Sequence, residues 1–220
     1  MYKELKNKIK HSEKLNLDFG GIFFYTLNLM QIKFHIFIFN RIIHFICFCK
    51  GIKLGNNIKF HGIPTIRRYP NSSIQFGNDC KFNSAKNSIS IGLDQPCAFV
   101  TWTENAAIKF GNNSGASGLK IDARSTITIG NNVLIGSGCI ILDNDSHSSD
   151  PQKRNQYIIP SKPIRIEDNV FIGTKCLILK GVTIGKNSVI GAGSVVFNDI
   201  PENSIALGNP CKVIIKRNLN

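Results

Sequence analysis

The chain has 220 residues, enough for one domain of good size with a small appendage. Apolar residues make up 42% of the chain and charged residues 19%, a composition that excludes a disordered protein. There are 27 Lys and Arg against 14 Asp and Glu, a formal net charge of +13, so anionic partners are favoured. Charge alone does not choose among nucleic acid, a membrane surface, an acidic polymer and a phosphate-rich cofactor.

Residues 1–50 form a basic, aromatic segment that we expect to be helical and amphipathic. A cleaved signal peptide is not expected, because no small-residue cleavage site follows the apolar stretch. Polar residues, among them Lys33, Asn40 and Arg41, interrupt this stretch so often that a transmembrane helix is disfavoured. Two interpretations stay open: the segment touches the inner face of a membrane, or it packs on the main domain or a neighbouring subunit.

The seven cysteines are scattered, without a CxxC pair. An odd number without a disulfide framework is typical of reduced thiols in a cytosolic protein, where cysteine serves as a small apolar residue. We therefore expect a cytoplasmic protein, with the possibility of peripheral contact at the inner face of the membrane.

Large apolar residues recur at every sixth position in the second half of the chain. The series is Ile129, Ile135, Ile141, and then Ile166, Ile172, Ile178, Ile184, Ile190 and Val196. A smaller residue stands two positions before several of these, at Val170, Cys176, Val182, Ser188 and Ser194. A period of six fits neither a helix nor one alternating strand, so it predicts short flat strands joined by tight corners.

The corner sequences support this interpretation. Gly-Asn-Asn occurs at residues 55–57, 111–113 and 130–132. Gly and Asn adopt positive φ more easily than other residues, which sharp corners require. The corner clusters follow one another at roughly eighteen residues, or three repeats for each coil of a triangular solenoid. The pattern is regular from about Phe110 to Val196, weaker from Leu54 to Phe82, and irregular between Ile91 and Thr103.

CLILKGVTIGKNSVIGAGSVV (Cys176 to Val196) resembles the closing coils of the hexapeptide-repeat acyltransferases, which fold as left-handed parallel β-helices. IEDNVFIG resembles the start of those coils, and DIPENSIALGNPCKVI (Asp199 to Ile214) resembles their exit, with Cys211 in place of alanine. The resemblance implies a mainly β, left-handed solenoid over residues 51–216, with an extruded loop at 143–165 and a tail at 217–220. It also implies a homotrimer with active sites between subunits, and acetyl-CoA as acyl donor.

The interval from Ile141 to Ile166 is twenty-five residues, which is not a multiple of six, so part of it must leave the coil. This loop contains His147, one of five histidines, which matches the loop histidine that the family uses. Neutral imidazole can remove the proton of an attacking hydroxyl and return it to a departing thiolate, so we predict His147 as the general base. A solvated turn is the alternative, because the loop is rich in Asn, Asp and Ser.

A carboxylate on the other ring nitrogen would fix the tautomer of the base. Asp145 is the first candidate, with Asp143 and Asp150 behind it. A strand-like alternation would place Asp143, Asp145 and His147 on one side of the chain. Asp143 and Trp102, the only tryptophan, are candidates for contact with the acceptor, and Trp102 could form a wall for a sugar ring or pack in the core.

The resemblance assigns further residues to coenzyme A. These are Gly173 and Thr174, whose amides would hold the thioester carbonyl, Ala192 and Gly193 along the pantetheine arm, and Pro210 and Lys212 at the nucleotide end. Positive charge for the phosphates is available at Lys180, Lys186, Lys212, Lys216 and Arg217.

We therefore predict an acetyl-CoA-dependent O-acetyltransferase that modifies a sugar hydroxyl in a surface polysaccharide or lipid-linked glycan. A free sugar, an amino sugar, serine or an antibiotic is the alternative acceptor. A non-catalytic solenoid scaffold is the alternative of another class. A metal site is not expected, because a zinc-dependent hydration enzyme on this scaffold needs three imidazoles. Nucleic acid is not an expected partner, because no aromatic-basic motif accompanies the charge.

Overall fold

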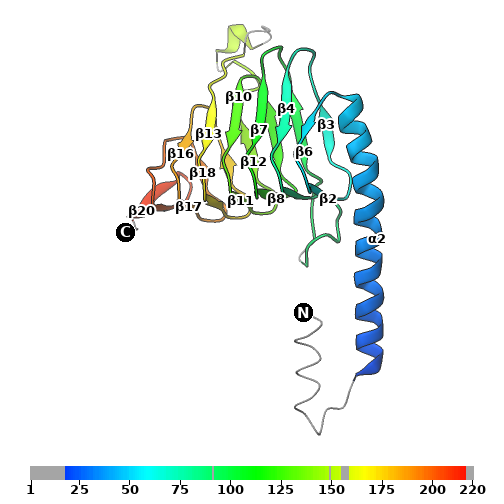
Figure 1. Ribbon diagram of the computed structural model, residues 1–220. Helices are drawn as coiled ribbons and strands as arrows, with labels where there is room; N and C mark the ends of the chain where they lie inside the picture. Colours follow the sequence, from blue (N-terminus) through cyan, green and yellow to red (C-terminus); the bar gives the residue numbers. More distant parts are fainter. Residues whose placement is uncertain (1–17, 91, 149, 155–158, 217–220) are drawn as a thin grey trace. The chain divides into compact units, whose positions relative to one another are not determined.

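The computed structural model describes residues 18–90, 92–148, 150–154 and 159–216. Contacts divide the chain into two compact units, of which the second spans His35–Asn220. This second unit is a solenoid in which the chain winds through three parallel sheets in turn (Figure 1). The predicted triangular arrangement of three strands per coil is confirmed.

We name the sheets A, B and C in the order in which each coil meets them. Sheet A holds β1 (Lys53–Leu54), β4 (Ser73–Phe76), β7 (Ala107–Phe110), β10 (Thr126–Ile129), β13 (Ile164–Ile166) and β16 (Thr183–Ile184). Sheet B holds β2 (Lys59–His61), β5 (Lys81–Asn83), β8 (Gly115–Ser117), β11 (Leu134–Ile135), β14 (Phe171–Ile172), β17 (Val189–Ile190), β19 (Ser204–Leu207) and β20 (Lys212–Lys216). Sheet C holds β3 (Thr65–Arg67), β6 (Ala98–Thr101), β9 (Lys120–Ala123), β12 (Ile140–Leu142), β15 (Leu177–Ile178) and β18 (Val195–Val196). Only β19 and β20 pair antiparallel among these named strands. The chain turns a corner between one sheet and the next, so the three sheets meet along three long edges, which we name A–B, B–C and C–A.

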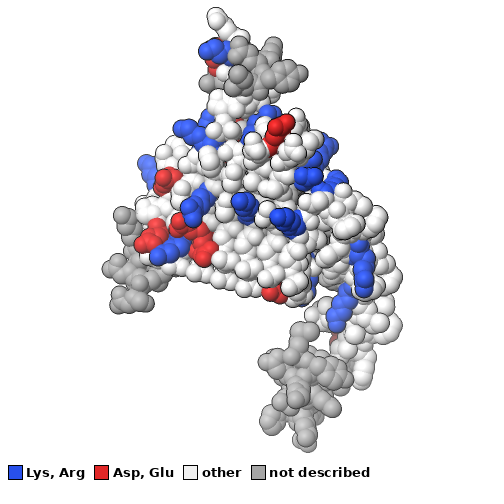
Figure 2. All heavy atoms as spheres, turned by 45° about the horizontal axis from the view of Figure 1, so that its top comes forward, with Lys and Arg blue, Asp and Glu red and all other residues white. Residues whose placement is uncertain are grey.

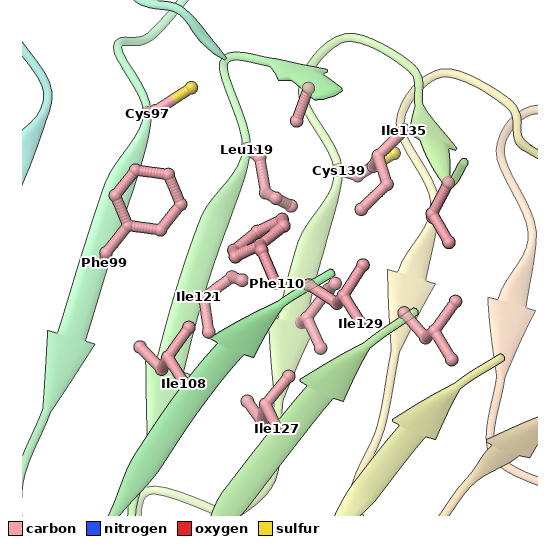
Figure 3. Close-up of a cluster of buried hydrophobic side chains, with 14 of the residues drawn as sticks. Cys97, Phe99, Ile108, Phe110, Leu119, Ile121, Ile127, Ile129, Ile135 and Cys139 are labelled. Carbon is pink, nitrogen blue, oxygen red and sulfur yellow. The ribbon is translucent and has the colours of Figure 1, made fainter. Parts of the chain in front are cut away.

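The core of the solenoid is a stack of inward side chains, one set from each coil. All the large apolar positions of the six-residue period from Ile129 to Val196 are buried, and so are the smaller residues two positions before them. Figure 3 shows side chains of the three sheets meeting in this core. The first coils are filled instead by a cluster of phenylalanine rings with centroids 5.0 to 6.1 Å apart, namely Phe60, Phe76, Phe82, Phe99 and Phe110.

The Gly-Asn-Asn sequences form the A–B edge, as the pattern predicts. Asn57, Asn113 and Asn132 each have φ of 54°, in the left-handed region. The Asn78 side chain accepts a hydrogen bond from the N–H of Asn56 at 2.8 Å, and the same contact repeats from coil to coil. These ladders satisfy corner N–H groups that no strand could pair.

Helix α2 (Phe19–Cys49) begins after Asp18, whose carboxylate accepts the N–H of Gly21 at 2.8 Å. Within the second unit, its residues from His35 onward cover the open end of the first coil. Ile43 and Cys47 are buried there, and Asn40 Oδ1 accepts the N–H of Phe60 at 2.7 Å. The end of the helix therefore caps the core, which a solenoid requires at its termini. The boundary at residue 50 stays a prediction.

The predicted helix is confirmed from Phe19 to Cys49, whereas residues 1–17 of the predicted segment lie outside the described part of the chain. Its predicted division into a polar and an apolar face is wrong. Ile22, Phe23, Phe24 and Tyr25 are consecutive, and each is 47 to 66% exposed. Successive helical residues are about 100° apart, so these four side chains cover all sides of the helix. The helix is long and apolar enough to cross a membrane by length and composition, a test that soluble core helices and signal sequences also pass.

Two segments interrupt the coils. Between β5 and β6 the chain makes an excursion that spans residues 84–97, which explains the irregular pattern before Thr103. The excursion is tied to later coils, because Asp94 pairs with Lys175 at 2.5 Å. The second interruption is the loop between Leu142 and Ile164, which includes a short 3₁₀ helix at Pro151–Lys153. It ends two residues earlier than the predicted loop at 143–165. Figure 1 shows this loop projecting from one edge of the solenoid.

Candidate active site

The base of the second loop is anchored at the C–A edge by Asp143. Its buried carboxylate accepts the N–H groups of Arg124 and Ser125, each at 2.7 Å. Burial raises the pKa of Asp143, and the two amides oppose this rise. The prediction that Asp143 contacts the acceptor or orients His147 is therefore wrong, since its oxygens are already used inside the fold.

Asn144 continues this anchor. Its side chain is buried and donates to Asp122 Oδ1 at 2.9 Å, while its own oxygen accepts the N–H of Ser146 at 2.9 Å. Asn144 also forms an antiparallel bridge with Ser161, on the returning arm of the loop. Ser146 has φ of 60°, so the chain turns here and does not alternate as a strand. This turn is why Asp143 and His147 do not share a side.

His147 is exposed beyond this turn. Its main-chain N–H donates to the carbonyl oxygen of Asp145 at 2.7 Å, and no described residue forms a hydrogen bond with its ring. The Asp145 carboxylate instead pairs with Lys180, from the C–A corner of the next coil. Asp150 caps the 3₁₀ helix and pairs with Lys153 at 3.6 Å. A carboxylate partner for the imidazole thus stays a prediction.

Trp102 stands on the same edge, at the end of β6. It is 42% exposed, so core packing is excluded, and its Nε1 donates to Asp122 Oδ2 at 2.7 Å. The guanidinium of Arg124 lies over its ring, 5.8 Å from the centroid. Because Asp122 also bonds Asn144, it links Trp102 to the base of the His147 loop.

The predicted coenzyme A residues lie on the B–C edge and the adjoining C-terminal strands. Gly173 packs so closely on the next coil that a Cβ would lie 2.5 Å from Ala192 N. The N–H of Gly173 already donates to Ile190 O at 2.8 Å, so its predicted role as a carbonyl donor is wrong. The N–H of Thr174 has no acceptor among the described residues and remains free for that role.

The neighbouring corner is open. Gly193 has φ of 72°, and no atom lies within 4 Å of the position of an added Cβ. Ala192, Pro210 and Lys212 are all exposed. Among the other predicted phosphate contacts, Lys180 lies on the C–A edge and Lys186 pairs with Glu202 at 3.1 Å. Arg217 and the Lys216 side chain lie outside the described residues.

The two groups of predicted residues are separated by the width of sheet C. Thr174 and Gly193 precede β15 and β18, whereas the loop with His147 follows β12. Parallel strands of one sheet begin at one edge and end at the other, so one chain does not bring both groups into a single site. In the part of the chain that the structure describes, no cluster of three or more His, Cys, Asp or Glu is placed to hold a metal ion.

Comparison with known proteins agrees with this architecture. Residues 163–198 match the family model described as the hexapeptide repeat of succinyl-transferase. A Staphylococcus aureus protein named as an acetyltransferase is 49% identical over 152 residues, which cover 60% of this chain and 72% of that one. The galactoside O-acetyltransferase of Escherichia coli is 43% identical over 121 residues, covering 54% and 58%. A solved galactoside acetyltransferase in complex with coenzyme A has a TM-score of 0.51 and 32% identity, covering 76% and 65%.

The solenoid is thus a left-handed parallel β-helix with an extruded loop. The chain belongs to the hexapeptide-repeat acetyltransferase family. It spans between 43 and 58% of the length of the first four curated relatives that it matches.

Proposed function

We propose that the protein transfers an acetyl group from acetyl-CoA to a hydroxyl group of a sugar. The observation that carries this proposal is the exposed imidazole of His147, held out from the coil by the anchored pair Asp143 and Asn144. The relatives named as galactoside O-acetyltransferases support a sugar acceptor. Acetyl-CoA supplies the acyl group in activated form, as a thioester.

The B–C edge suits the donor. The open corner at Gly193 leaves room for an extended arm, and the free N–H of Thr174 is positioned as a donor for a carbonyl oxygen. Lys212 adds positive charge at the C-terminal end of this edge, where an anionic nucleotide would be favoured. The coenzyme A complex of the galactoside acetyltransferase supports this assignment.

His147 acts as the base. Its neutral imidazole takes the proton of the acceptor hydroxyl as that oxygen attacks, and returns the proton to the departing thiolate sulfur. One proton is taken up and one released, so the side chain ends the cycle as it began. The acceptor lies beside Trp102, whose exposed ring suits the apolar face of a sugar.

A complete site needs a second copy of the chain. The predicted homotrimer places the C–A edge of one copy against the B–C edge of the next, and the outward apolar side chains Leu134 and Phe171 on sheet B support self-association.

The acceptor is a surface polysaccharide or lipid-linked glycan at the inner face of the membrane, where α2 makes peripheral contact. This location is supported by the exposed apolar surface of the helix and by the free cysteines. The small acceptors and the non-catalytic scaffold remain the alternatives.

The test compares the full-length protein with its His147→Ala variant. Purified protein is incubated with acetyl-CoA and galactosides, and released thiol is measured. We expect the variant to lose about 10²- to 10⁴-fold of the rate, the usual contribution of a general base, with an unchanged circular dichroism spectrum. Equal rates for the two proteins would remove His147 from the mechanism. Absence of thiol release over a panel of sugars would favour the scaffold.

A further inference from the structure

The C–A edge carries more than the His147 loop. Successive coils end sheet C with Tyr69 beyond β3, Trp102 beyond β6 and Arg124 beyond β9, and the loop follows β12. Adjacent coils are about 4.8 Å apart, so these four positions form a row about 14 Å long. The row is longer than one sugar ring and ends where the loop with His147 leaves sheet C.

The two aromatic residues of the row are exposed, and hydrogen bonds hold the main chain at both of them. Tyr69 and Trp102 are each 42% exposed, although both are large aromatic residues. The N–H of Tyr69 donates to the buried hydroxyl of Thr101 at 2.9 Å, which ties it to the residue before Trp102. Trp102 is fixed in turn by Asp122 and by its own N–H, which donates to Ala123 O at 2.9 Å. Two exposed rings on adjacent coils suit two successive sugar rings.

Arg124 gives the row a charge preference. Its guanidinium makes no hydrogen bond or ion pair with any described residue, and the Nε atom is buried without a partner. Two nearby carboxylates are engaged elsewhere: Asp122 bonds Trp102 and Asn144, and Asp143 bonds main-chain N–H groups. Figure 2 shows that Lys and Arg are spread over the face turned forward, while Asp and Glu are fewer. The guanidinium lies over the Trp102 ring, but it has no ion-pair partner among the described residues, and such a group suits a carboxylate or phosphate.

We propose that the C–A edge binds an extended, acidic glycan, with Tyr69 and Trp102 stacking on successive sugar rings and Arg124 holding an anionic group. This inference rests on the proposed function, because it identifies the class of acceptor that reaches His147. As acceptor, it favours an acidic polymer over a free sugar, serine or an antibiotic.

The sole tryptophan of the chain makes the binding directly measurable, because Trp102 fluorescence reports on this edge without catalysis. The full-length protein is titrated with galacturonic acid oligomers, from the monomer to the hexamer, and with neutral malto-oligosaccharides of the same lengths. We expect saturable changes in fluorescence, and affinity that rises with length and is greater for the acidic series. Unchanged fluorescence with every hexamer, or equal affinity for monomer and hexamer, would overturn the proposal.

Two variants measure the contributions of Tyr69 and Arg124 to binding while Trp102 remains as the fluorescent probe. Tyr69→Ala is expected to weaken hexamer binding about fivefold, the size of one aromatic contact, and to leave monomer binding unchanged. Arg124→Gln is expected to remove about tenfold of the preference for the acidic series, the loss of one charge-assisted hydrogen bond. Tyr25→Ala on the helix and Arg165→Gln on sheet A are the matched controls and should bind as the parent does. Retention of the acidic preference in Arg124→Gln would overturn the role of the guanidinium.

The failure of this inference is distinct from the failure of the proposed function. Saturable binding of acidic hexamers without thiol release from acetyl-CoA would support the inference and contradict the transferase. Acetyl transfer to a sugar, measured as thiol release, with no change in Trp102 fluorescence would support the transferase and overturn the inference.

Discussion

His61 is a buried base without a hydrogen-bond partner on Nε2 among the described residues. Burial lowers the pKa of its imidazole, and Lys81 and His35 add to the effect. Because the folded pKa lies below the unfolded value, the unfolded chain takes up the proton first on acidification. Folding stability attributable to His61 therefore falls as the pH drops below about 6.5, and stops falling below the folded pKa.

The His61→Gln variant should lack this dependence. We expect the melting temperature of the parent protein to fall more than that of His61→Gln between about pH 7.5 and pH 5.5, because glutamine does not titrate. Thermal unfolding followed by circular dichroism measures both. His44→Gln, at an exposed histidine, is the control and should keep the parent's dependence. Equal acid sensitivity in parent and His61→Gln would assign the effect to other groups.

Individual residues differ in how far the sequence could assign them. The burial of Ile172 or Ile184 follows from the six-residue period, since each repeat points one large side chain inward. No sequence pattern predicts the hydrogen bond between Asp122 and Asn144, because these residues are twenty-two positions apart and meet only through the register between coils. The engagement of the Gly173 N–H likewise depends on a neighbouring coil, which only the stacked structure supplies.

Among the elements, α2 is divided in burial. Its residues from His35 onward cap the solenoid, while Phe19, Phe23, Phe24 and Met30 are each more than 60% exposed. The six-residue apolar period predicts even strands that are only two residues long, because each of them points a large side chain into the core. It could not predict the faces of this helix, because apolar residues surround it and only packing shows which of them are covered.

We expect the full-length protein to float with vesicles that contain phosphatidylglycerol, and less with vesicles of phosphatidylcholine alone. The exposed apolar side chains of α2 would insert between lipids, and the net charge of +13 favours anionic headgroups. Flotation on a density gradient measures the bound fraction. Phe23→Asp should weaken binding roughly tenfold or more, since burial of one aromatic side chain is lost.

Phe197→Asp is the control for this experiment, because Phe197 is an exposed aromatic residue at the end of sheet C. It should float as the parent does. If Phe23→Asp floats equally well, the exposed helix surface does not bind lipid.

At the scale of the molecule, the predicted donor and acceptor residues occupy different edges. The B–C edge carries the free Thr174 N–H and the open corner at Gly193, and the C–A edge carries His147 and Trp102. Sheet C lies between them, so a chain on its own cannot join the two groups. A cyclic trimer would solve this by setting unlike edges against each other at each of its interfaces.

Two inactive variants should therefore restore activity when they share a trimer. His147→Ala lacks the base but keeps the donor edge, and Ala192→Trp keeps the base but fills the donor edge with a bulky side chain. Co-expression with two different tags and purification on both gives only mixed trimers. Every mixed cyclic trimer then has one interface at which an intact His147 faces an intact donor edge, so about a third of the parent rate should return. Thiol release measures this rate, and each variant purified alone is the control. If the mixed trimers are as inactive as the separate variants, each site is built within one chain and the cross-subunit arrangement is wrong.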